Sequence, residues 1–99
     1  MIGKEDFVTF EVAKMLHEKG YSGMITCTTL YEAARWLRNK KIYISALPTR
    51  DNGVTCWYYQ VVNDNDPDDI YYTTSQDTYP NYESALNEGI KYALNSFEL

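Results

Sequence analysis

The sequence is poor in the side chains on which most enzymes depend. It contains one histidine, two cysteines and five glycines among 99 residues. The histidine and the two cysteines do not have the spacing of a zinc site, and the glycines do not form a phosphate-binding loop. A nucleophile elbow and a paired catalytic carboxylate pattern are also missing. We therefore expect no enzymatic activity, no metal and no cofactor.

The chain also lacks a long apolar run. No window approaches the roughly 18 apolar residues of a membrane-spanning helix. Residues 1–6 lead directly into polar sequence, without the apolar stretch of a secretory signal. Cys27 and Cys56 are therefore expected to be reduced thiols and not a disulfide. The sequence predicts a cytoplasmic protein that does not enter a membrane.

Positive charge is scarce in the second half of the chain. One lysine and nine acidic residues give residues 51–99 a charge of −8, whereas eight basic and five acidic residues give residues 1–50 a charge of +3. Such a split predicts a dipole that orients charged partners. The net charge of −5 opposes general binding to nucleic acid, because phosphates repel an acidic body.

The spacing of apolar residues predicts helices at residues 10–19, 30–39 and 82–96. Each is preceded by a residue type that caps helix N-termini, namely Thr9, Thr29 and Asn81. Thr29 and Glu32 have the spacing of a capping box, and Gly20 is suited to end the first helix. His17, near the end of that helix, is expected to be solvated.

Three stretches rich in β-branched and aromatic residues predict strands at residues 42–47, 54–62 and 70–74. Pro48 is expected to end the first strand, and Asn52-Gly53 predicts a tight hairpin turn before the second. A shorter extended piece is expected at residues 24–26.

The predicted order is therefore α-α-β-β-β-α in a single domain of residues 1–99. Short connections between sequential strands favour an antiparallel meander. A three-stranded sheet needs a helical layer for stability. The predicted fold is a two-layer α+β domain, a three-stranded antiparallel meander with helices packed on one face.

Tyrosine is abundant, with ten residues against three phenylalanines. Six tyrosines lie in or beside the predicted strands: Tyr43, Tyr58, Tyr59, Tyr71, Tyr72 and Tyr79. Because strand alternation sends neighbours to opposite faces, both faces of the sheet carry aromatic rings. If helices cover one face, the other presents Tyr58 or Trp57 to solvent, and such residues are favoured in binding hot spots. The alternative is that tyrosine suits half-buried strands because its hydroxyl reaches water.

An acidic loop follows the second predicted strand, and its four carboxylates are Asp64, Asp66, Asp68 and Asp69. Their spacing resembles the start of a calcium loop, but Asp69 stands where an EF-hand needs glycine and Ser75 stands where it needs glutamate. A solvated loop is the favoured interpretation, with weak divalent binding as the alternative. We expect these carboxylates, together with Trp57 and Tyr59, to form a binding site for a protein partner.

A basic cluster at the end of the second predicted helix supports a different function. Its members are Arg35, Arg38, Lys40 and Lys41, which flank Trp36. The cluster fits a phosphate-binding patch. Residues 29–96 have the element order of a double-stranded RNA-binding domain, but the final helix offers only Lys91 to phosphates, which argues against that version. The alternative is a helix end with dipole-matched cations, Arg35 paired with Glu32, and Trp36 in the core.

Several stretches in sequence order carry a family resemblance: DFVTFEVAK (6–14), EKG (18–20), WLR (36–38), IYI (42–44), YESALNEGI (82–90) and AL (93–94). They resemble small uncharacterised proteins encoded by phages and mobile elements of gut bacteria. The resemblance implies a cytoplasmic accessory protein of bacterial or phage origin. The family has no established activity, so no site residue is carried over from it.

The sequence as a whole predicts a small accessory protein that acts as a protein-interaction module. The partner is another protein or, if an aromatic face or sheet edge self-associates, a second copy in a homodimer. Nucleic-acid binding through the basic cluster is the alternative function.

Overall fold

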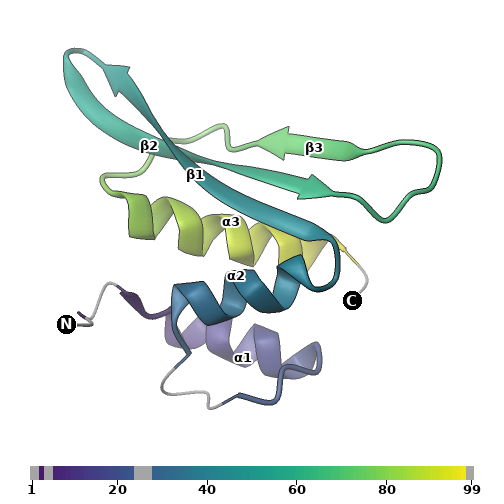
Figure 1. The fold of residues 1–99 in the computed structure, drawn as a ribbon. Coiled ribbons are helices and arrows are strands. Elements are labelled where there is room, and N and C mark those ends of the chain that lie inside the picture. Colours follow the sequence, from purple (N-terminus) through teal and green to yellow (C-terminus); the bar gives the residue numbers. More distant parts are fainter. Residues whose placement is uncertain (1–2, 4–5, 24–27, 98–99) are drawn as a thin grey trace.

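The computed structural model describes residues 3, 6–23 and 28–97. The elements have the predicted order, and they are α1 (Phe10–Glu18), α2 (Leu30–Arg38), β1 (Ile42–Asp51), β2 (Val54–Asn63), β3 (Tyr71–Thr74) and α3 (Tyr82–Ser96) (Figure 1). The extended piece expected at residues 24–26 lies outside the described residues, as does Cys27. None of the described helices is long and apolar enough to cross a membrane.

The helices begin where the sequence predicts, because each has a local cap. The Thr9 hydroxyl accepts a hydrogen bond from the Val12 amide at 3.3 Å. Thr29 and Glu32 form the reciprocal capping box, and the Asn81 side chain accepts from the Ser84 amide at 2.8 Å. Helix α1 ends at Glu18 with Lys19 as its C-cap, and Gly20 follows with a φ of +102° that only glycine adopts without strain.

The three strands form one antiparallel sheet in the order β1-β2-β3. Strands β1 and β2 pair along their whole length, from Ile42 opposite Asn63 to Asp51 opposite Val54. Asn52 and Gly53 form the turn between them with φ values of 50° and 79°. Two consecutive positive φ angles are those of a two-residue hairpin turn, so the prediction from Asn-Gly is confirmed.

The expectation that Pro48 ends the first strand is wrong, because β1 continues to Asp51. Pro48 lies opposite Trp57, which exchanges both of its backbone hydrogen bonds with Tyr79 at 2.9 and 2.7 Å on the other side of β2. The pair of Pro48 and Trp57 therefore needs no ladder hydrogen bond. Strand β1 is an edge strand, and proline is tolerated there at a position whose nitrogen points away from the sheet.

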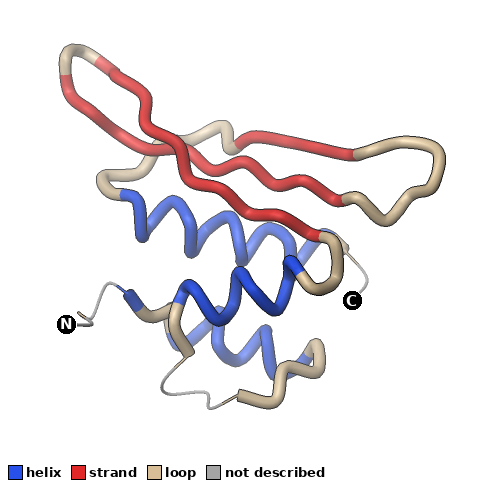
Figure 2. The backbone as a smooth tube through the Cα atoms, viewed as in Figure 1, coloured by secondary structure: helices blue, strands red, loops and turns tan. Residues whose placement is uncertain are grey.

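The domain has two layers, with the sheet on one side and all three helices on the other (Figure 1, Figure 2). Helix α3 lies directly against β1 and β2, whereas α2 packs against β1 and α3, and α1 packs against α3. The fully buried side chains come from every helix and from two strands, and the largest are Leu16, Leu37, Ile42, Ile90, Leu94, Val12 and Val61. The core therefore lies between the sheet and α3 and continues into the space between the helices.

His17 is less solvated than its sequence position predicts. Its side chain is half-buried, and its ring lies edge-on to Tyr21 with 5.9 Å between centroids. The Nε2 atom is buried and has no hydrogen-bond partner in the described part of the chain. After Gly20 the chain turns back and places Tyr21 against this face of α1. The apolar spacing within a single helix does not indicate that contact.

Candidate protein-binding face

The inner face of the sheet is fixed by its contact with α3. A Cβ atom placed on Gly89 of α3 would lie 2.8 Å from Ile44 Cγ2 and 3.0 Å from Tyr59 Cβ. Ile42 and Val61 have the same phase on their strands and are fully buried. Since side chains alternate along a strand, the residues between them point to the opposite side.

We call that opposite side the outer face, and the helices leave it uncovered (Figure 1). Short of the hairpin turn, its positions are Tyr43, Ser45, Leu47 and Thr49 of β1, Cys56, Tyr58, Gln60 and Val62 of β2, and Tyr72 and Thr74 of β3. None of these residues is charged, and the pair of Asp51 and Val54 at the turn brings one carboxylate in the same phase. The solvated face of an antiparallel sheet normally carries polar side chains. An uncharged face with three tyrosines has the composition of an interface core.

The apolar residues of the outer face form rows across the strands. Tyr43, Val62 and Tyr72 are cross-strand neighbours in one row, and Leu47 and Tyr58 are neighbours in another. The exposed fractions of Tyr72 and Tyr43 are 64% and 38%. Leu47, Tyr58 and Val62 are half-buried although they lie outside the core cluster. Neighbours within the rows therefore shield one another and give a continuous surface.

The acidic loop borders one end of this face (Figure 1). It leaves β2 after Asn63 and enters β3 at Tyr71, so it adjoins the row that contains Tyr72. Its four carboxylates, Asp64, Asp66, Asp68 and Asp69, are all exposed. The ion pair in the described part of the chain involves none of them, which leaves their charge available to a partner.

Two backbone anchors hold the acidic loop beside the turn between α2 and β1. The Asp64 amide donates to the Lys41 carbonyl at 2.9 Å, and the Asn65 side-chain amide donates to the Lys40 carbonyl at 2.8 Å. Within the loop, the Asp66 carboxylate accepts from the Asp68 amide at 2.9 Å. The described residues contain no group of three His, Cys, Asp or Glu side chains placed to hold a metal ion.

The aromatic residues predicted to join these carboxylates lie elsewhere. Tyr59 lies on the inner face between Tyr79 and Tyr92, with ring centroids 6.2 and 6.0 Å away, and burial raises its pKa. Trp57 is half-buried and edge-on to Tyr82 at 5.6 Å. Trp57 is also about 20 Å from the end of β2 at ~3.3 Å per residue.

The structure therefore does not bring the two parts of the predicted site together. Tyr43 and Tyr72 are the aromatic neighbours of the acidic loop, and sequence reasoning did not select them. Strand alternation separates Tyr59 and Val61 from Tyr58 and Val62, but each phase carries one tyrosine and one valine. The choice between them requires knowing which phase the helices cover.

The basic cluster is spread around the end of α2. Arg35 and Arg38 are exposed, whereas the Lys40 ammonium lies 4.7 Å above the ring of Trp36. Trp36 is half-buried and edge-on to Tyr21 at 6.0 Å. The Glu32 carboxylate is used by the capping box, and the described contacts include no ion pair between it and Arg35.

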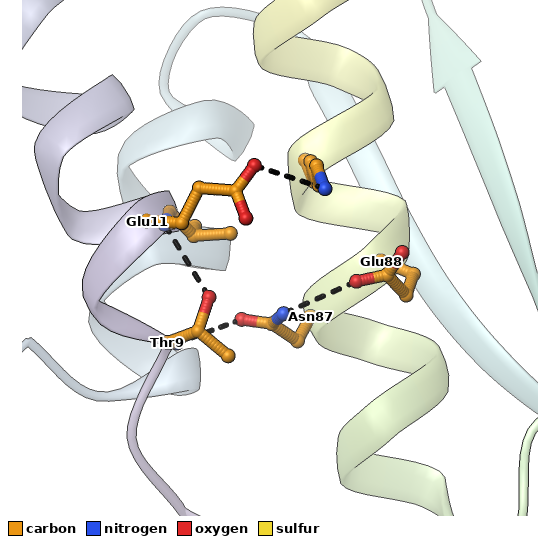
Figure 3. Close-up of polar contacts among 6 residues, drawn as sticks. Thr9, Glu11, Asn87 and Glu88 are labelled. Atoms are coloured by element: carbon orange, nitrogen blue, oxygen red, sulfur yellow. Dashed lines mark hydrogen bonds and ion pairs between the residues drawn. The ribbon is translucent and has the colours of Figure 1, made fainter.

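Polar contacts also join α1 to α3 (Figure 3). The Thr9 amide donates to the side-chain oxygen of buried Asn87 at 3.1 Å. Lys91 forms an ion pair with Glu11 at 3.0 Å, and its pKa is raised chiefly by that hydrogen bond. The one basic residue of the second half of the chain is therefore engaged within the molecule and turned away from the outer face.

Two open grooves lie on the helical side, with volumes of about 550 and 530 Å³. The first contains Glu83 and Glu88, and the second contains Arg38 together with Asp6 and Glu83. The second groove combines charges of both signs, and neither groove contains a histidine or a cysteine. They therefore indicate no class of substrate.

The outer face and the acidic loop are the surfaces whose composition is least explained by the fold. Cys56, which lies on this face, carries a free thiol. No protein-family model, curated protein or solved structure matches the chain.

Proposed function

We propose that the protein is a non-enzymatic, cytoplasmic interaction module that binds another protein through the outer face of its sheet. The observation that carries the proposal is the absence of charge from every position of that face between Tyr43 and Thr49, between Cys56 and Val62, and at Tyr72 and Thr74. Interface cores are depleted of charged residues and enriched in tyrosine in the same way. The three tyrosines supply rigid apolar area and a hydroxyl each.

A second copy of this chain is a poorer occupant than a different protein. The outer face measures roughly 20 Å along β1 and β2 and 15 Å across only where β3 adds a third strand, so its area is below about 300 Å², and a stable interface buries about 800 Å² on each partner. A second copy would also bring another net charge of −5 beside the acidic loop. A heterologous partner with a basic surface adds contacts with that loop and enlarges the interface.

Affinity capture from lysate of the native host tests this proposal with matched variants. The bait is the full chain, and the test variant is Tyr43→Ser/Tyr72→Ser. The control is Tyr31→Ser on α2, because Tyr31 has an exposed fraction of 66% and lies on the helical side. We expect one protein to be recovered by the parent and by the control. Its recovery should fall at least tenfold with the double variant.

The other outcomes decide between the alternatives. Equal recovery by all three baits contradicts the outer face as the binding surface. A dimer that dissociates on Tyr43→Ser/Tyr72→Ser replaces the heterologous partner with a second copy. Salt-sensitive retardation of duplex RNA that is lost on Arg35→Ala/Arg38→Ala supports the nucleic-acid alternative instead.

A further inference from the structure

We infer that the partner presents a single basic helix, which lies along the strands of the outer face with its cationic residues over the acidic loop. This inference rests on the proposed function, and it adds the shape and charge of the partner's contacting element. It joins two observations, the dimensions of the uncharged face and the position of the unpaired carboxylates at one end of it.

The dimensions fit one helix. An α-helix is about 10–12 Å in diameter, which matches the ~10 Å between the axes of β1 and β3 at the Tyr43 row, and β1 and β2 continue the surface where β3 has ended. The distance of about 20 Å from the Tyr43 row to the Thr49 row corresponds to roughly 13 helical residues. Apolar residues at helical spacing would contact the Tyr43–Val62–Tyr72 row first and the Leu47–Tyr58 row next.

Addition of a partner strand at a sheet edge fits less well. Strand β3 has four residues, from Tyr71 to Thr74. On β1, the edge positions with outward-pointing backbone include Pro48, which has no N–H to donate. A strand added to either edge would also leave the outer face unused. The face is therefore the docking surface.

The charges set the direction of the partner. Asp64, Asp66, Asp68 and Asp69 are exposed beyond the Tyr72 end of the face, whereas the opposite end has one carboxylate in phase, that of Asp51. The anchors from Asp64 and Asn65 to the carbonyls of Lys41 and Lys40 keep the loop at this end. Complementary charge at an interface rim steers association and fixes orientation. Lys and Arg residues at one end of the partner helix would be attracted to the acidic loop and would fix the direction in which the helix lies.

A displayed library of random 16-residue peptides, selected on the full chain, tests the inference. We expect the enriched peptides to be basic, to carry apolar residues at helical spacing, and to gain helical circular dichroism on binding. Their affinity should fall at least tenfold on Tyr43→Ser/Tyr72→Ser, since those rings provide the anchors. It should fall about three- to tenfold, mainly through slower association, on Asp66→Asn/Asp68→Asn/Asp69→Asn.

Asparagine retains the side-chain oxygens that accept from the Asp68 and Ile70 amides, so the loop variant changes charge and keeps its backbone contacts. The control removes the same number of charges from exposed positions away from the outer face, with Glu18→Gln/Glu32→Gln/Asp77→Asn, and glutamine at position 32 keeps the oxygen of the capping box. Binding that falls equally with both triple variants reports net charge alone and overturns the placement of the cationic end.

The remaining outcomes separate this inference from the proposed function. Enriched peptides that need the two tyrosines but are neutral or acidic overturn the basic helix and leave the outer face as a binding surface. Peptides that bind regardless of the tyrosines overturn both. A selection without tyrosine-dependent binders overturns the single-helix partner, while capture of an intact partner still tests the proposed function.

Discussion

At the scale of single residues, two backbone positions explain how the sheet meets its surroundings. Lys41 has a φ of 61°, a left-handed conformation that costs a side-chain-bearing residue roughly 1–2 kcal/mol. Its carbonyl accepts the amide of Asp64, so the turn and the acidic loop are held by the same residue. Gly89 sets the distance between α3 and the sheet, because a methyl group there would contact Ile44 and Tyr59.

Replacement of Lys41 by glycine should stabilise the protein. Glycine adopts this φ freely and retains the carbonyl, so we expect Lys41→Gly to raise the free energy of unfolding by about 0.5–1 kcal/mol. Urea unfolding followed by circular dichroism measures the change. Lys40→Gly is the control, and it should lower stability because Lys40 lacks a positive φ and contacts Trp36. A loss of stability in Lys41→Gly would contradict the strain assigned to this turn.

Replacement of Gly89 by alanine should destabilise the protein. Alanine is the better helix former by about 1 kcal/mol, but its methyl group forces α3 away from the sheet at a cost of about 1–3 kcal/mol. We expect a net loss in urea unfolding, together with altered near-ultraviolet dichroism from Tyr59. Asn95→Ala on the exposed side of the same helix should gain slightly from propensity. A net gain from Gly89→Ala would show that the contact relaxes without cost.

At the scale of elements, features set by neighbouring residues could be predicted from the sequence, whereas features set by contacts between distant segments could not. The caps at Thr9, Thr29 and Asn81 act within four residues, so the helix starts follow from the sequence. The continuation of β1 through Pro48 depends on the hydrogen bonds of Trp57 with Tyr79, which lies 22 positions further along the chain. No local pattern contains that information.

Pro48 also gives a prediction for the edge of the sheet. Pro48→Thr adds an N–H that points away from β2, and an unblocked edge strand pairs readily with another chain. We expect the variant to fold but to form concentration-dependent dimers in sedimentation velocity. Pro67→Thr makes the same chemical change in the acidic loop, and its sedimentation should match that of the parent protein. A monomeric Pro48→Thr variant would mean that other features already protect this edge.

At the scale of the whole molecule, the fold reshapes the charge pattern of the sequence. The halves carry +3 and −8 along the chain, but Lys40 and Lys41 adjoin the acidic loop in space. The fold also separates the residues of the predicted protein-binding site, since Trp57 and Tyr59 face inward while Tyr43 and Tyr72 face solvent. Which face the helices cover is a long-range property, so the sequence predicted an aromatic sheet and an acidic loop but not which aromatic residues adjoin the loop.

The raised pKa values of two tyrosines on the inner side of the sheet determine how the stability of the protein depends on pH. Burial raises the pKa of Tyr59 and of Tyr79, so the folded state favours their neutral forms. Their contribution is fully present below the unfolded pKa of about 10 and is lost as pH rises through the higher folded value. We expect the urea midpoint to fall above pH ~10. Tyr59→Phe should reduce this decline, and Tyr72→Phe on the outer face should retain it.

The contacts of α1 with α3 have a consequence for the order of folding during synthesis. The Thr9 amide and its acceptor on Asn87 are separated by 78 positions, and the ion pair of Glu11 joins Lys91 of the same late helix. A nascent chain that has exposed α1, α2 and the β1–β2 hairpin still lacks the surface on which α1 packs. Helix α1 therefore keeps its apolar stripe uncovered until α3 has left the ribosome.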